Sequence, residues 1–180
     1  MATYLSILRG INVSGQKMIK MDALKKMYES AGFNNVRTFI QSGNVVFESN
    51  THKSLASFIE QKIKETFGFD VPVIVRTQKE VQEIIEQNPF LKDKNIEPDR
   101  LYVTFLAEIP LAENLTKIST YDYTPDVFII KGKEVYLYCP KPKGYGDTKL
   151  SNKFFENKLK VKATTRNWKT TNELLRILKS

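Results

Sequence analysis

A six-residue segment near the C-terminus gathers several groups that could bind a ligand. It reads Ala163-Thr164-Thr165-Arg166-Asn167-Trp168 and combines two hydroxyls, a guanidinium, an amide and the chain's single tryptophan. It precedes an amphipathic run, so we expect it to join a strand to a final helix, with Thr170 or Thr171 as the N-cap. Donors at a helix start favour an anion, because free backbone N–H groups and a partial positive charge gather there. Thr165, Arg166 and Asn167 are therefore candidate ligand-binding residues.

Polar side chains also follow the first predicted strand, in the segment Leu8-Arg9-Gly10-Ile11-Asn12. The glycine allows a sharp exit from the strand and a close approach of a ligand to the backbone. Arg9 and Asn12 then either face a shared cleft or belong to an ordinary surface turn, since loops carry both kinds of residue. Both stay candidates for anion binding.

A predicted β-hairpin carries the next candidates. Its first strand is expected to place Arg37 and Gln41 on one face, because alternate residues of a strand share a face. Ser42-Gly43-Asn44 forms the tight connection, where glycine supplies a positive φ. Turn chemistry is enough to explain Gly43, whereas Arg37, Gln41 and Asn44 stay open as ligand-binding residues.

A glycine-rich segment, Lys143-Gly144-Tyr145-Gly146-Asp147-Thr148-Lys149, precedes another predicted helix. Backbone amides of such a loop can cradle a phosphate, and Lys149 would add a point charge. The spacing is neither that of G-x-x-x-x-G-K-[ST] nor that of G-x-G-x-x-G, so it matches no nucleotide-binding signature. The alternative is a flexible connection without a ligand.

The net charge of the chain is concentrated at one end. The 180 residues carry a net charge of +8, and residues 141–180 alone hold 11 Lys or Arg and 3 Asp or Glu. A basic balance confined to one segment indicates an electropositive surface that faces an anionic small molecule or a nucleic acid. The alternative is a solvated, lysine-rich helix face.

Few residues support metal binding or a familiar catalytic arrangement. With one histidine and one cysteine the chain has no zinc cluster and no internal disulfide, and we predict no cofactor. No apolar run approaches the roughly 20 residues of a membrane span, and the first residues lack the features of a signal peptide. We expect a cytoplasmic protein, because a single cysteine suits a reducing compartment. Catalytic residues and the oligomeric state stay unassigned.

The elements that must position these residues form two successive β-α-β-β-α-β series. The first has strands at 3–9, 36–41, 44–48 and 71–75 and helices at 21–31 and 55–67. A helix at 78–87 links it to a second series, with strands at 101–106, 126–130, 134–139 and 161–165 and helices at 111–118 and 150–159. The sequence thus predicts an α+β fold of two ferredoxin-like halves packed together. The predicted ranges are 1–76 for the first half, 77–99 for the linking helix and loop, and 100–180 for the second half with the C-terminal helix.

An aromatic sheet face is expected in the second half. The strand phases place Tyr102, Thr104, Tyr136 and Tyr138 on one side. Such a face either stacks bases, as in RNA-recognition modules, or is covered by another element or a second subunit. The signature sequence of the RNA-recognition module is missing. Trp168 is expected to be buried, because it has a large apolar surface and one donor to satisfy.

Several strings resemble those of a bacterial family of unknown function, domain-of-unknown-function family 1697. They are Leu8-Arg9-Gly10-Ile11-Asn12-Val13, Val36-Arg37-Thr38, Gln41-Ser42-Gly43-Asn44-Val45-Val46-Phe47, Asn88-Pro89-Phe90 and the segment 163–168. The resemblance covers nearly the whole chain. One departure is Thr148, where the family more usually has serine, and a hydroxyl is kept. The resemblance implies a soluble bacterial α+β protein and brings no established activity, cofactor or catalytic residue.

The leading interpretation is a binding protein for an anionic ligand, either a phosphorylated small molecule or a nucleic-acid backbone. Its site is drawn from Arg9, Asn12, Arg37, Gln41, Asn44, Lys149, Thr165, Arg166 and Asn167. One alternative is an enzyme that acts on a phosphate-bearing substrate and stabilises developing negative charge. Another is an interaction module that uses the sheet face as a subunit interface. An enzyme predicts a concave pocket, whereas a nucleic-acid binder predicts an extended basic stripe.

Overall fold

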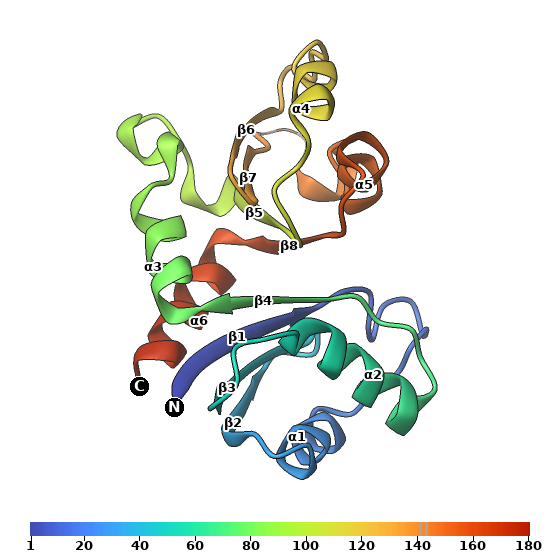
Figure 1. Cartoon of the computed structure of the whole chain (residues 1–180). Coiled ribbons are helices and arrows are strands. Elements are labelled where there is room, and N and C mark those ends of the chain that lie inside the picture. Colours follow the sequence, from blue (N-terminus) through green and yellow to red (C-terminus); the bar gives the residue numbers. More distant parts are fainter. Residues whose placement is uncertain (141, 143) are drawn as a thin grey trace. The chain divides into compact units, whose positions relative to one another are not determined.

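The structure is a computed structural model that describes residues 1–140, 142 and 144–180. It has an α+β fold with two four-stranded antiparallel sheets (Figure 1). The chain divides into two compact units. The first unit comprises Met1–Gln82 and Glu173–Ser180, and the second comprises Glu83–Asn172. The predicted ranges 1–76, 77–99 and 100–180 stay a prediction.

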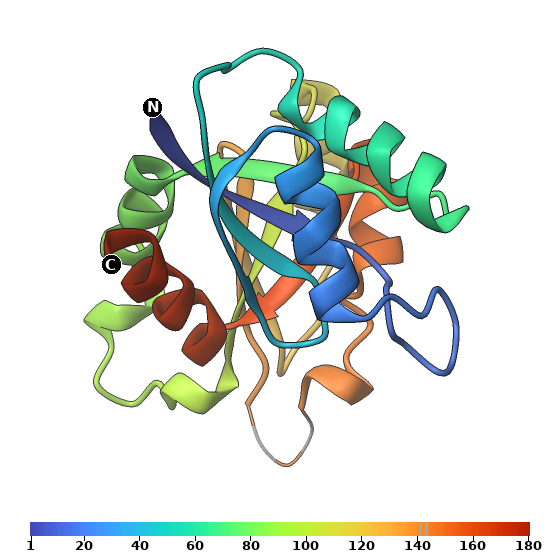
Figure 2. The same cartoon turned by 90° about the horizontal axis from the view of Figure 1, so that it is seen from below.

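The first unit has the predicted β-α-β-β-α-β order. Its elements are β1 (Ala2–Leu8), α1 (Met21–Ser30), β2 (Asn34–Phe39), β3 (Asn44–Ser49), α2 (Leu55–Phe67) and β4 (Val73–Thr77), followed by α3 (Gln78–Glu86). The strand order is β2-β3-β1-β4, so β2 and β4 are the edges. Helices α1 and α2 lie on the same face of the sheet (Figures 1 and 2).

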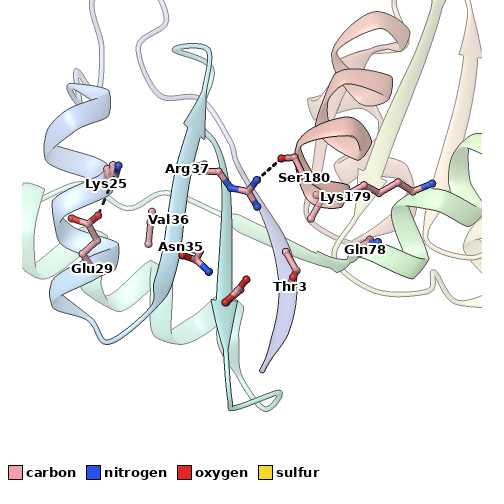
Figure 3. Close-up of a pocket in the computed structure, with 11 residues that line it drawn as sticks. Thr3, Lys25, Glu29, Asn35, Val36, Arg37, Gln78, Lys179 and Ser180 are labelled. Atoms are coloured by element: carbon pink, nitrogen blue, oxygen red, sulfur yellow. Dashed lines mark hydrogen bonds and ion pairs between the residues drawn. The ribbon is translucent and has the colours of Figure 1, made fainter.

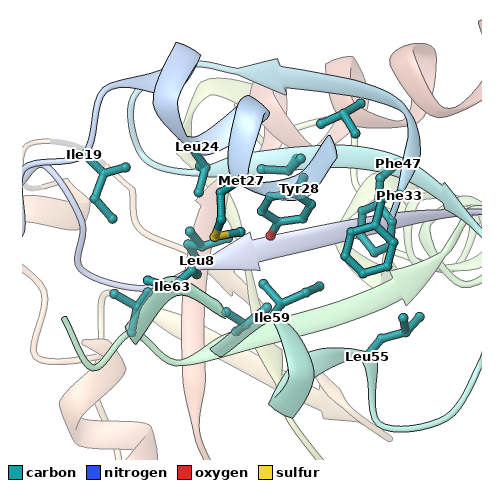
Figure 4. Packing of buried hydrophobic residues seen from close by; sticks show 14 of the residues in the cluster. Leu8, Ile19, Leu24, Met27, Tyr28, Phe33, Phe47, Leu55, Ile59 and Ile63 are labelled. Carbon is teal, nitrogen blue, oxygen red and sulfur yellow. The ribbon is translucent and has the colours of Figure 1, made fainter. Parts of the chain in front are cut away.

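Under these two helices lies the apolar core of the first unit (Figure 4). Leu24, Met27 and Tyr28 of α1 meet Ile59 and Ile63 of α2 above the sheet. The spacing of these residues puts them on one face of each helix, which is why the helices form against the sheet. The Tyr28 hydroxyl is not left unpaired, because it shares a 2.8 Å hydrogen bond with Ser6 Oγ.

The second unit repeats the same order. Its elements are β5 (Leu101–Leu106), α4 (Ala112–Ile118), β6 (Val127–Lys131), β7 (Glu134–Tyr138), α5 (Asn152–Leu159) and β8 (Ala163–Asn167). They are followed by α6 (Trp168–Lys179), whose residues from Glu173 onward belong to the first unit. Short 3-10 helices are η1 (Pro89–Lys92), η2 (Pro98–Arg100) and η3 (Tyr145–Asp147). The strand order is β6-β7-β5-β8. The core packs Ile118 of α4 and Phe155 and Leu159 of α5 with Leu137 of β7.

The last strand of each unit begins two residues later than predicted, and the reason is the same in both units. The first amide of β4, Val73 N, donates to Glu60 Oε1 at 2.9 Å. The first amide of β8, Ala163 N, donates to Glu156 Oε1 at 3.0 Å. In each case a glutamate of the preceding helix satisfies the free strand donor, which fixes where the strand starts.

The residue that ends each of these strands caps the helix that follows. Thr77 and Glu80 form a reciprocal capping box, in which Glu80 N donates to Thr77 Oγ1 at 3.1 Å and Thr77 N donates to Glu80 Oε2 at 2.7 Å. Asn167 Oδ1 accepts from Thr170 N at 2.7 Å. The prediction of Thr170 or Thr171 as the N-cap is therefore wrong, because α6 begins at Trp168, three residues earlier than the amphipathic run suggested. The predicted burial of Trp168 is confirmed.

The predicted tyrosine face is wrong. Residues paired directly across antiparallel strands share a face. Tyr102 pairs with Leu137, and Leu101 pairs with Tyr138, so Tyr102 and Tyr138 lie on opposite faces of the sheet. The phase of β5 relative to β7 depends on their register, which single strands do not reveal.

The strand pairing also shows which residues of the two sheets occupy corresponding positions. One row of directly paired residues crosses each sheet from its last strand, at one edge, to the strand at the other edge. The rows are Arg76–Leu5–Val46–Arg37 in the first unit and Arg166–Val103–Tyr136–Ile129 in the second. By this alignment Arg76 corresponds to Arg166, and Arg37 corresponds to Ile129.

Candidate functional site

Asn12 and Gln41, two of the predicted site residues, lie in contact. Asn12 Nδ2 donates to the carbonyl oxygens of Gln41 and Ile19, each at 2.9 Å, and Asn12 Oδ1 accepts from Ile19 N at 2.7 Å. Both amide hydrogens of Asn12 are thus used to hold the loop after β1. Gln41 lies beyond β2, which ends at Phe39, so the expectation that Arg37 and Gln41 share a strand face is wrong.

The hairpin connection is shaped by packing. Gly43 has φ +87°, and a Cβ there would lie 2.9 Å from Leu8 Cβ and 2.7 Å from Ile11 Cδ1. Asn44 is fully buried, and its Nδ2 donates to Phe39 O at 3.0 Å and to Ser42 Oγ at 3.2 Å. The hydrogens of the Asn44 amide are therefore used inside the hairpin. Arg9 follows β1, and its backbone N–H donates to Pro72 O at 3.0 Å.

The four candidates of the second unit lie along β8 and the loop before α5. Thr165 Oγ1 bonds Thr104 Oγ1 at 2.7 Å and donates to Asn152 Oδ1 at 2.6 Å. Asn167 is the cap of α6 described above, and Lys149 is exposed. Lys143 of the glycine-rich segment lies outside the described residues.

Arg166 is buried, with 8% of its surface exposed. Its Nη1 donates to Thr165 O at 2.9 Å and to Thr164 Oγ1 at 3.1 Å. Burial lowers the pKa of this guanidinium to about 10, which leaves it protonated at neutral pH. Arg76 at the corresponding position is 1% exposed and repeats the same local bond, from Nη1 to Val75 O at 3.1 Å. The shared position and bond indicate a structural role for this pair, which the sequence reading did not recognise.

One of the predicted residues, Arg37, lines a sizeable pocket in the first unit. This pocket, the Arg37 pocket, has a volume of about 760 Å³ and lies where α1, the edge of the sheet and the end of α6 meet (Figure 3). Its walls are mostly polar. The lining residues are Thr3, Lys25, Glu29, Asn35, Val36, Arg37, Glu48, Gln78, Leu178, Lys179 and Ser180.

The guanidinium of Arg37 is fixed by a hydrogen bond, but no carboxylate neutralises its charge among the described residues. Arg37 Nη1 donates to Ser180 Oγ at 2.6 Å (Figure 3), and Arg37 Nε is buried without a hydrogen-bond partner. Among the described residues no carboxylate lies within 4.0 Å of Arg37. A partly buried guanidinium with spare donors is poised for an anion, because its planar fork matches carboxylate and phosphate oxygens.

Two further cations and two carboxylates share the pocket. Lys25 lies 3.9 Å from Glu29, and both side chains are nearly half exposed, so this ion pair contributes little to stability and leaves Lys25 free to turn. Lys179 and Glu48 lie on other walls. Sequence reading missed Lys25 and Lys179, because helix residues 12 positions before Arg37 and at the far end of the chain carry no local signal.

The described residues contain no group of three or more His, Cys, Asp or Glu placed to hold a metal ion. None of the described helices is long and apolar enough to cross a membrane. The single cysteine, Cys139, is buried, and burial together with the nearby Asp126 charge raises its pKa to about 11.

Comparison with known proteins places the chain in a family. Residues 1–136 match the family described as protein of unknown function, DUF1697. The chain belongs to this family. None of the curated proteins matches the chain. Among solved structures it is similar to the conserved bacterial protein SP0830 from Streptococcus pneumoniae, with a TM-score of 0.80 at 20% identity, covering 100% of this chain and 99% of the other. At this identity the likeness supports the fold.

Proposed function

We propose that this DUF1697 protein binds a small anionic ligand, such as a phosphorylated metabolite, in the Arg37 pocket. The observation that carries the proposal is the partly buried guanidinium of Arg37, which has a buried Nε without a partner and no carboxylate within ion-pair distance among the described residues. A buried donor without an acceptor costs roughly 1–3 kcal/mol, and an anion that accepts from it removes this cost.

The charges around Arg37 favour a compact ligand over a nucleic-acid backbone. Lys25, Arg37 and Lys179 supply three positive charges, whereas Glu29 and Glu48 stand on the same walls. A compact anion needs to meet only the guanidinium of Arg37, since the ammonium of Lys179 points away from Arg37 (Figure 3). The carboxylates of Glu29 and Glu48 belong to the same pocket. A polyanion cannot avoid them, and like charges in a cleft disfavour binding. A hollow of about 760 Å³ also falls within the size range of small-molecule sites.

The proposal is tested by calorimetric titration and thermal melting with inorganic phosphate, glucose 6-phosphate and a mixed-sequence single-stranded oligonucleotide. We expect the phosphate compounds to bind and to raise the melting temperature, since a ligand that binds only the native state stabilises it. Arg37→Lys should weaken binding about tenfold, because lysine cannot copy the bidentate fork. The matched control is Arg176→Lys, which changes an exposed arginine of the first unit outside the pocket.

Two further variants separate the alternatives. Lys25→Gln should weaken binding, whereas Lys26→Gln, its exposed neighbour on α1 outside the pocket, should not. If Arg166→Lys abolishes binding while Arg37→Lys leaves it unchanged, the site lies at β8, as the sequence first indicated, and the pocket proposal is wrong. Release of phosphate from a bound phosphate ester, lost in Arg37→Lys, would favour the enzyme alternative.

A further inference from the structure

A second pocket lies in the second unit and has the opposite character. It has a volume of about 590 Å³ and is formed by α4, the connection from α4 to β6, and β6 itself. Apolar and aromatic side chains dominate its walls, among them Ile118, Tyr123, Phe128 and Ile130. The rings of Tyr123 and Phe128 lie 6.3 Å apart at 56°, and together they form an aromatic part of the pocket wall.

The charged residues of this pocket are both acidic. They are Asp122 and Asp126, and no Lys or Arg is among the lining residues. This is unexpected by composition, because the whole chain has a net charge of +8. Asp122 Oδ1 accepts from Thr124 N at 2.9 Å and from Thr124 Oγ1 at 2.5 Å. These two bonds lower the pKa of Asp122, so its carboxylate is charged at neutral pH.

Asp126 has one satisfied and one unsatisfied oxygen. Asp126 Oδ2 accepts from Thr148 Oγ1 at 2.6 Å, and Thr148 Oγ1 in turn accepts from Leu150 N at 3.1 Å. The single hydroxyl hydrogen of Thr148 thus serves Asp126 Oδ2 or the Cys139 thiol, and not Asp126 Oδ1. Asp126 Oδ1 is buried and has no hydrogen-bond partner among the described residues. A buried carboxylate oxygen without a donor is costly, and a positively charged donor satisfies it best.

We propose that this pocket, the Asp126 pocket, binds a small amphipathic amine, with an aromatic or branched apolar body and one protonated amino group. The apolar body lies against Tyr123, Phe128 and Ile130, and the ammonium donates to Asp126 Oδ1. Because Oδ1 is covered, the Asp126 carboxylate rotates about χ2, a broad torsion, to meet the amine. Asp122 adds a second negative charge at the same wall.

The occupant is a small molecule because the volume suits one and because the acidic lining selects a cation from other apolar ligands. The site is independent of the Arg37 pocket, since its residues all belong to the second unit. Failure of either proposal leaves the other standing.

The test uses three probes with the same phenyl body and different head groups: 2-phenylethylamine, 2-phenylethanol and 3-phenylpropanoate. Each is titrated into the full-length protein labelled with nitrogen-15, and amide shifts are followed by NMR. We expect the amine to shift resonances of residues 115–130, the alcohol to bind roughly ten- to a hundredfold more weakly, and the carboxylate not to bind. This ratio of dissociation constants corresponds to the free energy that one hydrogen bond to a charged group contributes.

The matched variants are Asp126→Asn and Glu113→Gln. Glu113 is an exposed acid of α4 outside the pocket, so Glu113→Gln should keep the preference for the amine. Asp126→Asn should lose most of the preference for the amine, with the small remainder that the Asp122 charge supplies. If Asp126→Asn does not fold, the comparison of the three probes on the wild type still decides. Equal binding of amine and alcohol, no binding of the amine at millimolar concentration, or concentration-dependent dimers that bury these resonances would overturn the proposal.

Discussion

The two units use corresponding positions of one scaffold for opposite chemistry. In each, a hollow lies beside one edge strand and the helix before it: β2 and α1 in the first unit, β6 and α4 in the second. The first hollow is polar and centred on Arg37, whereas the second is apolar and carries two aspartates. Register assigns Ile129 to the position of Arg37. The pocket chemistry was therefore free to change while the fold was kept.

The ends of the same rows on β4 and β8 carry the same residue type, arginine. Arg76 and Arg166 are both buried and both donate to the carbonyl oxygen of the preceding residue. A buried guanidinium that is removed leaves acceptors without donors, so this position tolerates little change. The contrast teaches that a repeated fold keeps the residues that satisfy its interior and varies those at its edges.

The largest expected effect sharpens the difference between the two hairpins. Gly43→Ala should lower the free energy of unfolding by about 2–5 kcal/mol, because positive φ costs a non-glycine residue roughly 1–2 kcal/mol and the crowding against Leu8 and Ile11 adds roughly 1–3 kcal/mol. Gly132→Ala, in the hairpin of the second unit, should lose only about 1–2 kcal/mol, since no atom lies within 4 Å of its Cβ position. Chemical denaturation measures both, and equal losses would contradict the packing argument.

A smaller effect tests whether Arg76 and Arg37, the two ends of one row in the first unit, differ in role, with Arg76 structural and Arg37 free to bind a ligand. Arg76→Met should cost about 1–3 kcal/mol of stability, because Val75 O loses a buried donor. Arg37→Met removes a buried donor that has no partner together with one hydrogen bond to Ser180, so its stability should change by less than about 1 kcal/mol. Denaturation without added anion, followed by phosphate titration, checks this. A large loss of stability in Arg37→Met would make Arg37 structural.

The smallest expected effect reports on the negative charge at the second pocket. Burial and the Asp126 charge raise the pKa of Cys139 from its usual 9.0 to about 11. Asp126→Asn should lower this pKa, and Glu113→Gln should not. The readout is the pH titration of the Cys139 Cβ resonance by carbon-13 NMR. An unchanged pKa in Asp126→Asn would show that Asp126 does not hold its charge near the thiol.

The raised pKa of Cys139 also has a stability consequence of known sign. Between about pH 9 and 11 the thiol of the unfolded chain ionises while that of the folded chain keeps its proton. The folded state then binds more protons, so the stability that Cys139 contributes is complete below about pH 9 and is lost as the pH rises toward 11. In the Asp126→Asn variant the folded-state pKa of Cys139 should be lower, so the pH range over which this stability is lost should be narrower.

The sequence determined the order of elements. Periodic apolar residues such as Leu24 and Met27, or Ile59 and Ile63, identify helices without any tertiary information, because one helix face must be buried wherever it packs. The alternation in the strands and the glycine at position 43 fixed the hairpins in the same way. The sequence also named Arg37 as a candidate ligand-binding residue, from its place on a predicted hairpin strand, and that role stays a prediction.

Only the tertiary structure decided which polar side chains use their hydrogen-bonding atoms within the protein. Asn12, Asn44 and Asn167 have the right chemistry for a ligand. The amide hydrogens of Asn12 and Asn44 hold a loop and a hairpin, however, and the side-chain oxygen of Asn167 caps a helix. Lys25, Lys179 and Asp126 gave no local signal, because the groups around them come from distant parts of the chain or from strand register. The sequence gives the chemical type of each side chain. Whether its hydrogen-bond donors and acceptors are left without partners depends on every neighbour that folding brings to it.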